Sequence, residues 1–248
     1  MFSSRCSCYG LYTLILMFLI MSEGVFGAIF TIVNRCDHTV WPGILPNAGS
    51  AGLETTGFQL RPGGSRVFRA EPGWSGRLWG RTGCTFDLTT GLGSCTTADC
   101  GSNTIDCNGA GANPPATLAE FTIGSGQLDF YDVSLVDGYN LPMAIEPVGG
   151  SGACGSTGCM TDLNWKCPAE LRAAGGQACR SACDAFKSPE YCCSGAFGSP
   201  ATCQPSVYSE IFKSACPRAY SYAYDDATST FTCGGADYTI TFCPSLTR

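Results

Sequence analysis

Short stretches in which apolar and polar residues alternate occur near both ends of the chain. Close to the C-terminus, Tyr238, Ile240 and Phe242 alternate with two threonines, and the three tyrosines in 220–224 alternate with small residues. A period of two predicts strands with one buried face. Further short, β-rich stretches bounded by Gly or Pro predict strands at 30–33, 66–68, 77–79 and 118–123.

Breakers interrupt these stretches frequently, because the chain contains 32 Gly and 14 Pro among 248 residues. Turn dipeptides at Asp137-Gly138 and Gly234-Gly235 fit between strands. Short strands separated by tight turns favour an antiparallel β-sandwich over a parallel sheet covered by helices. We therefore expect a mainly β fold.

Two regions depart from the strand pattern. Residues 84–107 hold four cysteines and show no apolar periodicity, which indicates a small loop module closed by two local disulfides. The cysteine-rich region 154–216 contains helical patterns at 168–173, 179–186 and 206–215, the last with Val207, Ile211 and Ala215 on one stripe. We interpret 154–216 as a disulfide-rich helical and loop region packed against the sandwich.

The first 27 residues have the layout of a secretory signal. Arg5 precedes an uncharged apolar run at 11–21, and small residues flank a cleavage site before Ala28. The run is too short for a membrane span, which needs about 20 apolar residues. We expect an exported chain of residues 28–248 without a transmembrane anchor.

Charge and composition exclude several function classes. The 14 basic and 20 acidic side chains give a net charge of −6, which argues against binding to nucleic acid or to anionic membranes. The only histidine, His38, argues against a Ser-His-Asp hydrolase and against a histidine-rich metal site. We expect no metal, no cofactor and a monomeric protein.

Cysteine is the composition's unusual feature. Removal of Cys6 and Cys8 with the signal leaves 16 of the 18 cysteines, an even number that indicates disulfides in an exported protein. Adjacent Cys192 and Cys193 must each bond elsewhere, because a bridge between neighbours would distort the peptide. Spacing alone leaves the pairing open.

Acidic side chains are the candidates for chemistry on sugars. Cleavage of a glycosidic bond needs two carboxyl groups, one protonated and one ionised, and no histidine. Glu120 lies within an apolar strand, and Asp132 and Asp137 bracket an apolar segment. An offset of five places two residues on opposite faces of a regular strand. Local pattern alone therefore does not bring these acids together.

The segment 91–100 (GLGSCTTADC) resembles the signature of the thaumatin-like proteins, the fifth class of plant pathogenesis-related proteins. Further matching segments cover the exported chain, at 29–36, 79–84, 114–121, 129–142, 216–226 and 229–233. The number of mature cysteines also matches. One departure is the loop between Cys100 and Cys107, which has six residues where five are usual.

The resemblance implies a β-sandwich with eight disulfides. The implied pairs are Cys36–Cys243, Cys84–Cys95, Cys100–Cys107, Cys154–Cys233, Cys159–Cys216, Cys167–Cys179, Cys183–Cys192 and Cys193–Cys203. This pairing gives Cys192 and Cys193 different partners, as the chemistry requires.

The resemblance also implies an acidic cleft between the sandwich and the helical region. By local motif its residues are Arg77, Glu120, Asp132, Asp137 and Asp225. A guanidinium among carboxylates keeps its nearest partner ionised, while crowding of like charges raises the pKa of another. The alternative is that this cluster only links strands and turns.

Three functions follow as hypotheses. The first is a secreted, antifungal plant defence protein in the extracellular space that binds β-1,3-glucan of fungal cell walls through the cleft. The second is a weak endo-β-1,3-glucanase with Glu120 as general acid and Asp137, or alternatively Asp132, as base or nucleophile. The third is a non-enzymatic stress-related structural protein or allergen without a sugar ligand.

Overall fold

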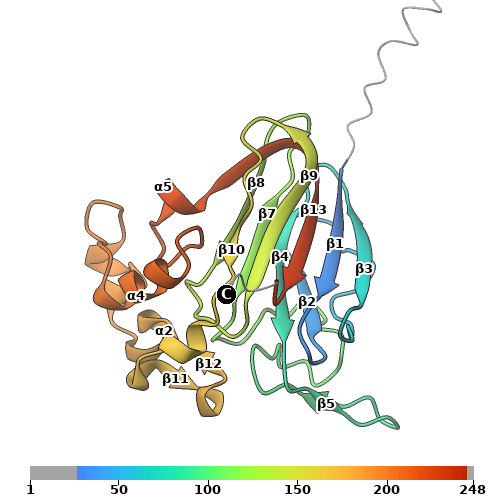
Figure 1. Cartoon of the computed structure of the whole chain (residues 1–248), viewed down its shortest axis with the longest axis horizontal. Helices are drawn as coiled ribbons and strands as arrows, with labels where there is room; N and C mark the ends of the chain where they lie inside the picture. Colours follow the sequence, from blue (N-terminus) through green and yellow to red (C-terminus); the bar gives the residue numbers. More distant parts are fainter. Residues whose placement is uncertain (1–26, 245–248) are drawn as a thin grey trace, which may run out of the picture.

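The computed structural model describes residues 27–244 (Figure 1). The predicted signal segment, apart from Gly27, therefore lies outside the described residues. Within the described part, no helix is long and apolar enough to span a membrane.

Strands dominate the molecule, as the alternating pattern predicted. Nine of them form one curled, sandwich-like sheet system: β1 (Ala28–Asn34), β2 (Trp41–Pro46), β3 (Ser65–Ala70), β4 (Ser75–Arg81), β7 (Leu118–Thr122), β8 (Asp129–Ser134), β9 (Met143–Ser151), β10 (Thr157–Cys159) and β13 (Phe231–Phe242). Two short hairpins lie apart from it: β5 (Thr85–Phe86) with β6 (Gly93–Ser94), and β11 (Arg172–Ala173) with β12 (Ala178–Cys179).

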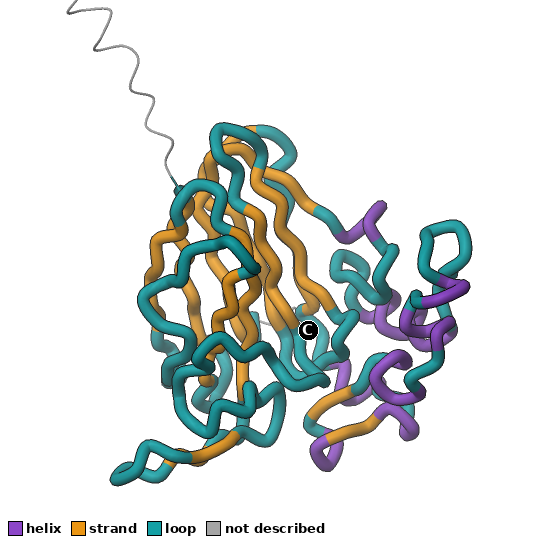
Figure 2. The backbone as a smooth tube through the Cα atoms, turned by 180° about the vertical axis from the view of Figure 1, so that it is seen from behind, coloured by secondary structure: helices purple, strands orange, loops and turns teal. Residues whose placement is uncertain are grey.

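The helices are short and gather on one side of the strands (Figure 2). The α-helices are α2 (Ala182–Phe186), α3 (Pro189–Cys192), α4 (Val207–Ala215) and α5 (Asp226–Ser229). The 3-10 helices are η1 (Leu163–Lys166), η2 (Ala169–Leu171), η3 (Ala174–Gly176) and η4 (Gly195–Phe197). The helical pattern predicted at 168–173 is realised only as the 3-10 helix η2, since Arg172 and Ala173 form the strand β11, and the pattern at 179–186 becomes helical only from Ala182.

Pairing between the main strands is antiparallel except at one place. The strand β1 runs parallel to β13 and antiparallel to β3, while β13 also pairs with β9, which pairs with β10. The second half of the sandwich has the order β8-β7-β4-β2. The predicted mainly β sandwich is thus confirmed, with one parallel pair that the prediction of an antiparallel sandwich did not include.

The strand β13 belongs to both halves. Its first residues, Phe231 to Cys233, pair with β8, and from Gly234 onward it pairs with β9. Gly235 adopts a φ of +63° and is skipped in the register with β9. Only glycine takes up such a conformation cheaply, so the chain bends without reversing. The turn predicted at Gly234-Gly235 is therefore wrong: the strand continues through it.

Aromatic rings fill the space between the two halves. The ring centroids of Phe30 and Phe121 are 4.7 Å apart, and Tyr238 lies 5.2 Å from Phe121 and 5.0 Å from Tyr131. All four side chains are buried. Burial of one large apolar side chain stabilises a fold by about 1.5–3 kcal/mol, so this cluster is a main source of stability.

Eight disulfides join the described cysteines, in the same pairs that the family resemblance implies. Cys36–Cys243 connects the two ends of the domain across 207 residues of sequence. Cys154–Cys233 and Cys159–Cys216 connect the helical region to the strands. Each cross-link restricts the unfolded chain, with a typical effect of about 2–4 kcal/mol.

A second, small core lies under the loop module 84–107. Trp79 is fully buried there among Ala98, Leu118 and the Cys100–Cys107 disulfide, and its Nε1 donates to Ala98 O at 3.0 Å. Beside it, Arg81 has an exposed fraction of 0% and donates hydrogen bonds to backbone carbonyls. Burial lowers the pKa of Arg81 to about 10, so the side chain stays charged at neutral pH and holds the module by hydrogen bonds to main-chain oxygens.

The helical region departs from two sequence predictions. Ser206 caps α4 with its hydroxyl, and the buried face of the helix carries Ser209, Phe212 and Ala215, while Val207 is 67% exposed. Of the predicted stripe of Val207, Ile211 and Ala215, only Ala215 therefore lies on the buried face, and Ile211 is half-buried. The three tyrosines in 220–224 form bends and turns instead of a strand, with only one bridge, from Tyr220 to Ser134.

Candidate ligand-binding site: an acidic cleft

Strand register places three of the predicted site residues side by side. Arg77 of β4 pairs with Glu120 of β7, and Glu120 pairs in turn with Asp132 of β8. Directly opposed residues of antiparallel strands have Cα atoms about 4.5–5.5 Å apart and side chains on the same face. A guanidinium and two carboxyl groups therefore form one row across three strands.

This row occupies the outer face of the sheet. In each of the three strands the neighbouring positions point into the sandwich core, where Leu78, Phe121 and Val133 are buried. The row residues themselves are only partly buried. Because side chains alternate along a strand, the core and the charged row use opposite faces of the same strands.

Asp137 reaches the same cleft from a turn. The chain turns just after β8, and Gly138 follows with a φ of +91°. A Cβ atom at Gly138 would lie 2.7 Å from the Cys179 carbonyl oxygen, so the turn needs glycine for space as well as for conformation. On a regular strand, Asp132 and Asp137 would point to opposite faces. Because Asp137 lies in a turn and not on a strand, both side chains can reach the same cleft.

The resulting cleft has a volume of about 390 Å³. Its lining residues come from β4, β7, β8, the turn that follows β8, and the loop and helix around α5: Arg77, Leu118, Glu120, Asp132, Ser134, Val136, Asp137, Tyr220, Ala223 and Asp226. Four carboxyl groups and one guanidinium share it, so the cleft is acidic.

The fourth predicted acid is replaced by its neighbour. Asp226, the first residue of α5, lines the cleft, whereas Asp225 does not. Asp225 forms an ion pair of 2.9 Å with Lys213 and accepts hydrogen bonds from Ser221 N and Oγ. Its side chain is only 12% exposed. The assignment of Asp225 to the cleft is therefore wrong: this carboxylate is used to hold the loop that carries Asp226.

Tyr220 is a further cleft residue that motif reasoning missed. Its hydroxyl donates to Asp226 Oδ1 at 2.9 Å and also contacts the hydroxyl of Thr230. Burial raises the pKa of Tyr220 to about 12, so the phenol stays protonated. The only signals in the sequence are the acidic pair 225–226 and the nearby tyrosines, and neither indicates which member faces the cleft.

The environment favours protonated acids in the cleft. Burial, together with the charges of Glu120 and Asp226, raises the pKa of Asp132 to about 8. Burial also raises the pKa of Glu120 and that of Asp137, and for both the positive charge of Arg77 opposes this effect. At neutral pH, Asp132 is therefore the group best able to donate a proton or a hydrogen bond.

Two polar atoms of the row have no hydrogen-bond partner in the part of the chain that the structure describes. They are Arg77 Nε and Asp132 Oδ1, one at each end, and both are buried. Among residues 27–244, no ion pair within 4.0 Å involves Arg77. A buried donor and a buried acceptor without partners cost free energy, about 1–3 kcal/mol each. Such groups are expected where a ligand or water completes the site.

Comparison with known proteins identifies the chain's family. The model of the Thaumatin family matches residues 34–244. The chain belongs to the thaumatin family. Thaumatin-like protein 1 of Arabidopsis thaliana is 67% identical, over 96% of this chain and 95% of that protein. Pathogenesis-related thaumatin-like protein 3.5 of Cryptomeria japonica is 59% identical, over 95% of this chain and 98% of that protein.

A solved structure agrees at the level of the fold. The thaumatin-like xylanase inhibitor TLXI superposes with a TM-score of 0.51 at 24% identity, covering 87% of this chain and 99% of that chain. Together with the high identities, this places the protein among the thaumatin-like, pathogenesis-related proteins.

Aromatic side chains could offer stacking faces for sugar rings, but most of those on or near the strands of the cleft are core residues in this thaumatin-family protein. Trp79, Tyr131 and Tyr139 are at most 1% exposed. Phe130 is the exception, at 49% exposed. It lies two residues before Asp132 on the same face of β8, and it is therefore the candidate ring closest to the charged row.

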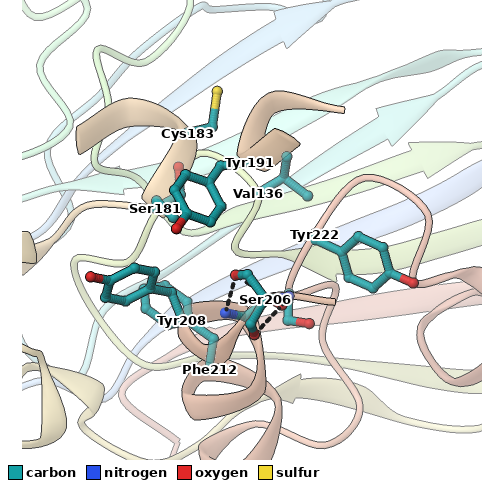
Figure 3. A pocket seen from close by; sticks show the side chains of 11 residues that line it. Val136, Ser181, Cys183, Tyr191, Ser206, Tyr208, Phe212 and Tyr222 are labelled. Carbon is teal, nitrogen blue, oxygen red and sulfur yellow. Dashed lines mark hydrogen bonds between the residues drawn. The ribbon is translucent and has the colours of Figure 1, made fainter. Parts of the chain in front are cut away.

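A small aromatic pocket adjoins the cleft, with Val136 in the walls of both (Figure 3). Tyr191, Tyr208, Phe212 and Tyr222 also line it. Its volume of about 30 Å³ has room for one or two water molecules but not for a sugar ring. The pocket is therefore too small for a saccharide, and Tyr191 and Tyr208 pack against neighbouring aromatic rings.

Asp99 and His38, two polar residues outside the cleft, have hydrogen bonds that explain them structurally. Asp99, in the family signature, accepts hydrogen bonds from Cys95 N and Gly101 N within the disulfide loops. His38 bonds to its neighbour Asp37 at 2.8 Å on the surface. Across the described residues, no group of three His, Cys, Asp or Glu side chains is placed to hold a metal ion.

Proposed function

We propose that this protein is a secreted plant defence protein that binds β-1,3-glucan of fungal cell walls through the acidic cleft. The observation that carries the proposal is the row of Arg77, Glu120 and Asp132, whose end atoms Arg77 Nε and Asp132 Oδ1 are buried without partners. Family membership supports a role in defence, because relatives of this chain are named pathogenesis-related proteins.

The chemistry of the row suits a neutral, hydroxyl-rich ligand. A sugar hydroxyl both donates and accepts hydrogen bonds, so it satisfies a guanidinium N–H on one side and a carboxyl oxygen on the other. Hydrogen bonds to charged groups contribute about 1.5–3 kcal/mol each. An anionic polymer is disfavoured, because four carboxyl groups share the cleft with the single guanidinium of Arg77.

Hydrolysis is the second candidate, and one observation favours it. The pKa of Asp132 is raised to about 8, as a general acid requires, while Arg77 favours the ionised forms of Glu120 and Asp137. In this version Asp132, and not Glu120 as the sequence suggested, carries the proton. Glu120 or Asp137 then acts as base or nucleophile in a weak endo-β-1,3-glucanase.

Export is part of the proposal. The signal layout of residues 1–27 directs the chain to the secretory pathway, and eight disulfides form and persist in an oxidising compartment. The extracellular space is where a plant protein meets fungal walls.

Retention on insoluble linear β-1,3-glucan tests binding, with insoluble β-1,4-glucan as the comparison polymer. We expect the unchanged protein to be retained on the first, and Arg77→Met to lose about tenfold or more in affinity because one charge-assisted hydrogen bond disappears. The matched control is Arg69→Met, an exposed arginine on β3 far from the cleft in sequence and register. Equal retention of Arg77→Met and Arg69→Met contradicts the proposal.

Reducing-sugar release from soluble β-1,3-glucan separates binding from hydrolysis. Products that disappear in both Asp132→Asn and Glu120→Gln support the enzyme. Retention without any products supports binding alone. Growth of fungal hyphae with the unchanged protein and with Arg77→Met then shows whether the same residue is needed for the antifungal effect.

A further inference from the structure

A second, larger groove lies apart from the acidic cleft. Its volume is about 1610 Å³, and it shares no lining residue with the cleft. One wall includes Trp41 and Thr82, from the side of β2 and β4, and the other includes Trp165, Arg172 and Gln177, from the region of η1, β11 and β12. Figure 1 shows β11 and β12 on one side of the lower part of the molecule and β2 and β5 on the other.

Trp165 is the outstanding side chain of this groove. Its exposed fraction is 86%, whereas Trp74 and Trp79 are nearly or fully buried. A ligand that covers the two apolar faces of this ring gains free energy from their burial. The position of the ring in the wall of a groove gives a ligand a second surface to contact.

The segment that presents Trp165 is rigid. Leu163, two residues earlier, is fully buried, and Asp162 caps the helix by accepting from Asn164 N. Asn164 Nδ2 donates to Asn140 O at 3.1 Å and to Gln177 O at 3.0 Å. The Cys167–Cys179 disulfide fixes the next turn. A ring held on such a base loses little conformational entropy when a ligand covers it.

The groove also offers balanced polar groups. Its charged lining residues are two arginines, Arg35 and Arg172, and two aspartates, Asp37 and Asp162. Asn164 uses its amide nitrogen twice and leaves Oδ1 buried in the groove wall without a partner among the described residues. Formal charges therefore cancel, in contrast to the acidic cleft, and donors and acceptors are both available.

We propose that this groove binds a neutral, β-linked polysaccharide, with one sugar ring stacked on Trp165. The flat, CH-bearing face of a β-linked pyranose matches an exposed indole, and its uncharged hydroxyls match a groove whose own charges cancel. Binding here does not depend on the acidic cleft. If both sites take the same polymer, the chain holds it at two points and gains affinity through effective concentration.

Titration of the full mature protein with three hexasaccharides tests the proposal: β-1,3-linked glucose, β-1,4-linked glucose and β-1,4-linked xylose. Binding is followed by tryptophan fluorescence and by calorimetry, because coverage of the exposed Trp165 ring shifts its emission. We expect saturable binding of at least one sugar, weakened at least about tenfold in Trp165→Ala. The ring is exposed, so the variant should keep the melting temperature of the unchanged protein. Leu88→Ala, which removes another fully exposed apolar side chain outside the groove, is the matched control.

The outcomes separate this groove from the acidic cleft. Loss of binding in Trp165→Ala but not in Arg77→Met supports the groove and counts against the cleft. Loss in Arg77→Met alone overturns the groove proposal and leaves the cleft proposal standing. Loss in both supports two sites on one polymer. If no hexasaccharide binds, or if Trp165→Ala and Leu88→Ala bind equally well, the groove proposal is overturned.

Discussion

Replacement of Asp132 by asparagine should change how the stability of this protein depends on pH. In the folded protein, burial and the neighbouring charges of Glu120 and Asp226 raise the pKa of Asp132 to about 8. In the unfolded chain an aspartate titrates near pH 3.9. Between these two values the unfolded state has released a proton that the folded state retains. Asparagine resembles the protonated acid in shape and has no proton to lose.

The size of the effect follows from linkage. Where the folded state holds one proton more than the unfolded state, the free energy of unfolding falls by about 1.4 kcal/mol per pH unit. The stability associated with protonated Asp132 is complete below about pH 4 and is lost progressively up to about pH 8. Between pH 5 and pH 7 the loss is about 2.7 kcal/mol, a large fraction of the stability of an ordinary domain.

Guanidinium unfolding at pH 5, 6 and 7, with the disulfides intact, measures this loss. The difference in unfolding free energy between Asp132→Asn and the unchanged protein should move by about 2–3 kcal/mol in favour of the variant as the pH rises from 5 to 7. Glu146→Gln, which removes an exposed carboxylate from β9, is the charge-matched control and should follow the unchanged protein. Parallel curves for Asp132→Asn and the unchanged protein would refute the assignment of Asp132 as the protonated member of the row.

Three further predictions concern other parts of the chain. Lys213→Met should lower the free energy of unfolding by about 3 kcal/mol, because it leaves the buried carboxylate of Asp225 without its cation. Arg81→Met should cost about 2–4 kcal/mol, since buried carbonyls such as Ile105 O lose their donor, and should expose the loop module to protease. N-terminal sequencing of the secreted protein should begin at Ala28, as the signal layout predicts.

Each of these three predictions has a control variant or a result that would contradict it. Lys166→Met and Arg69→Met remove exposed side chains and should change stability by less than about 0.5 kcal/mol. If Lys213→Met or Arg81→Met is as mild as its control, the corresponding contact contributes little to folding. A mature chain that starts well before or after residue 28 contradicts the cleavage site.

The pattern of apolar and polar residues predicted correctly those strands and helices that are specified by their own local sequence. Alternation identified the buried face of the last strand, where Tyr238, Ile240 and Phe242 are all 0% exposed. The helical pattern predicted at 206–215 is likewise realised, as α4 with Ser206 at its N-cap. By contrast, the tyrosines of 220–224 alternate in the same way but form bends and turns. An alternating segment becomes a β-strand only where a neighbouring strand pairs with it.

The site depended on information that local pattern does not contain. Periodicity assigns Arg77, Glu120 and Asp132 each to one face of its own strand. Whether the three side chains lie side by side depends on the register between strands that are distant in sequence. Local pattern likewise could not show which of Asp225 and Asp226 faces the cleft, because the ion pair that holds Asp225 away from it involves Lys213 of α4. Family resemblance supplied the row, and only the folded chain supplied the correct fourth acid.

The charged row lies on the outer face of the sheet, so its residues and the core residues of the same strands can vary separately. Substitutions at Arg77, Glu120 or Asp132 leave the aromatic layer on the opposite side of the same strands in place, and Arg77 Nε and Asp132 Oδ1 have no hydrogen bond within residues 27–244 that a substitution would break. The residues of the row can therefore be exchanged without repacking the core that holds the two halves of the sandwich together.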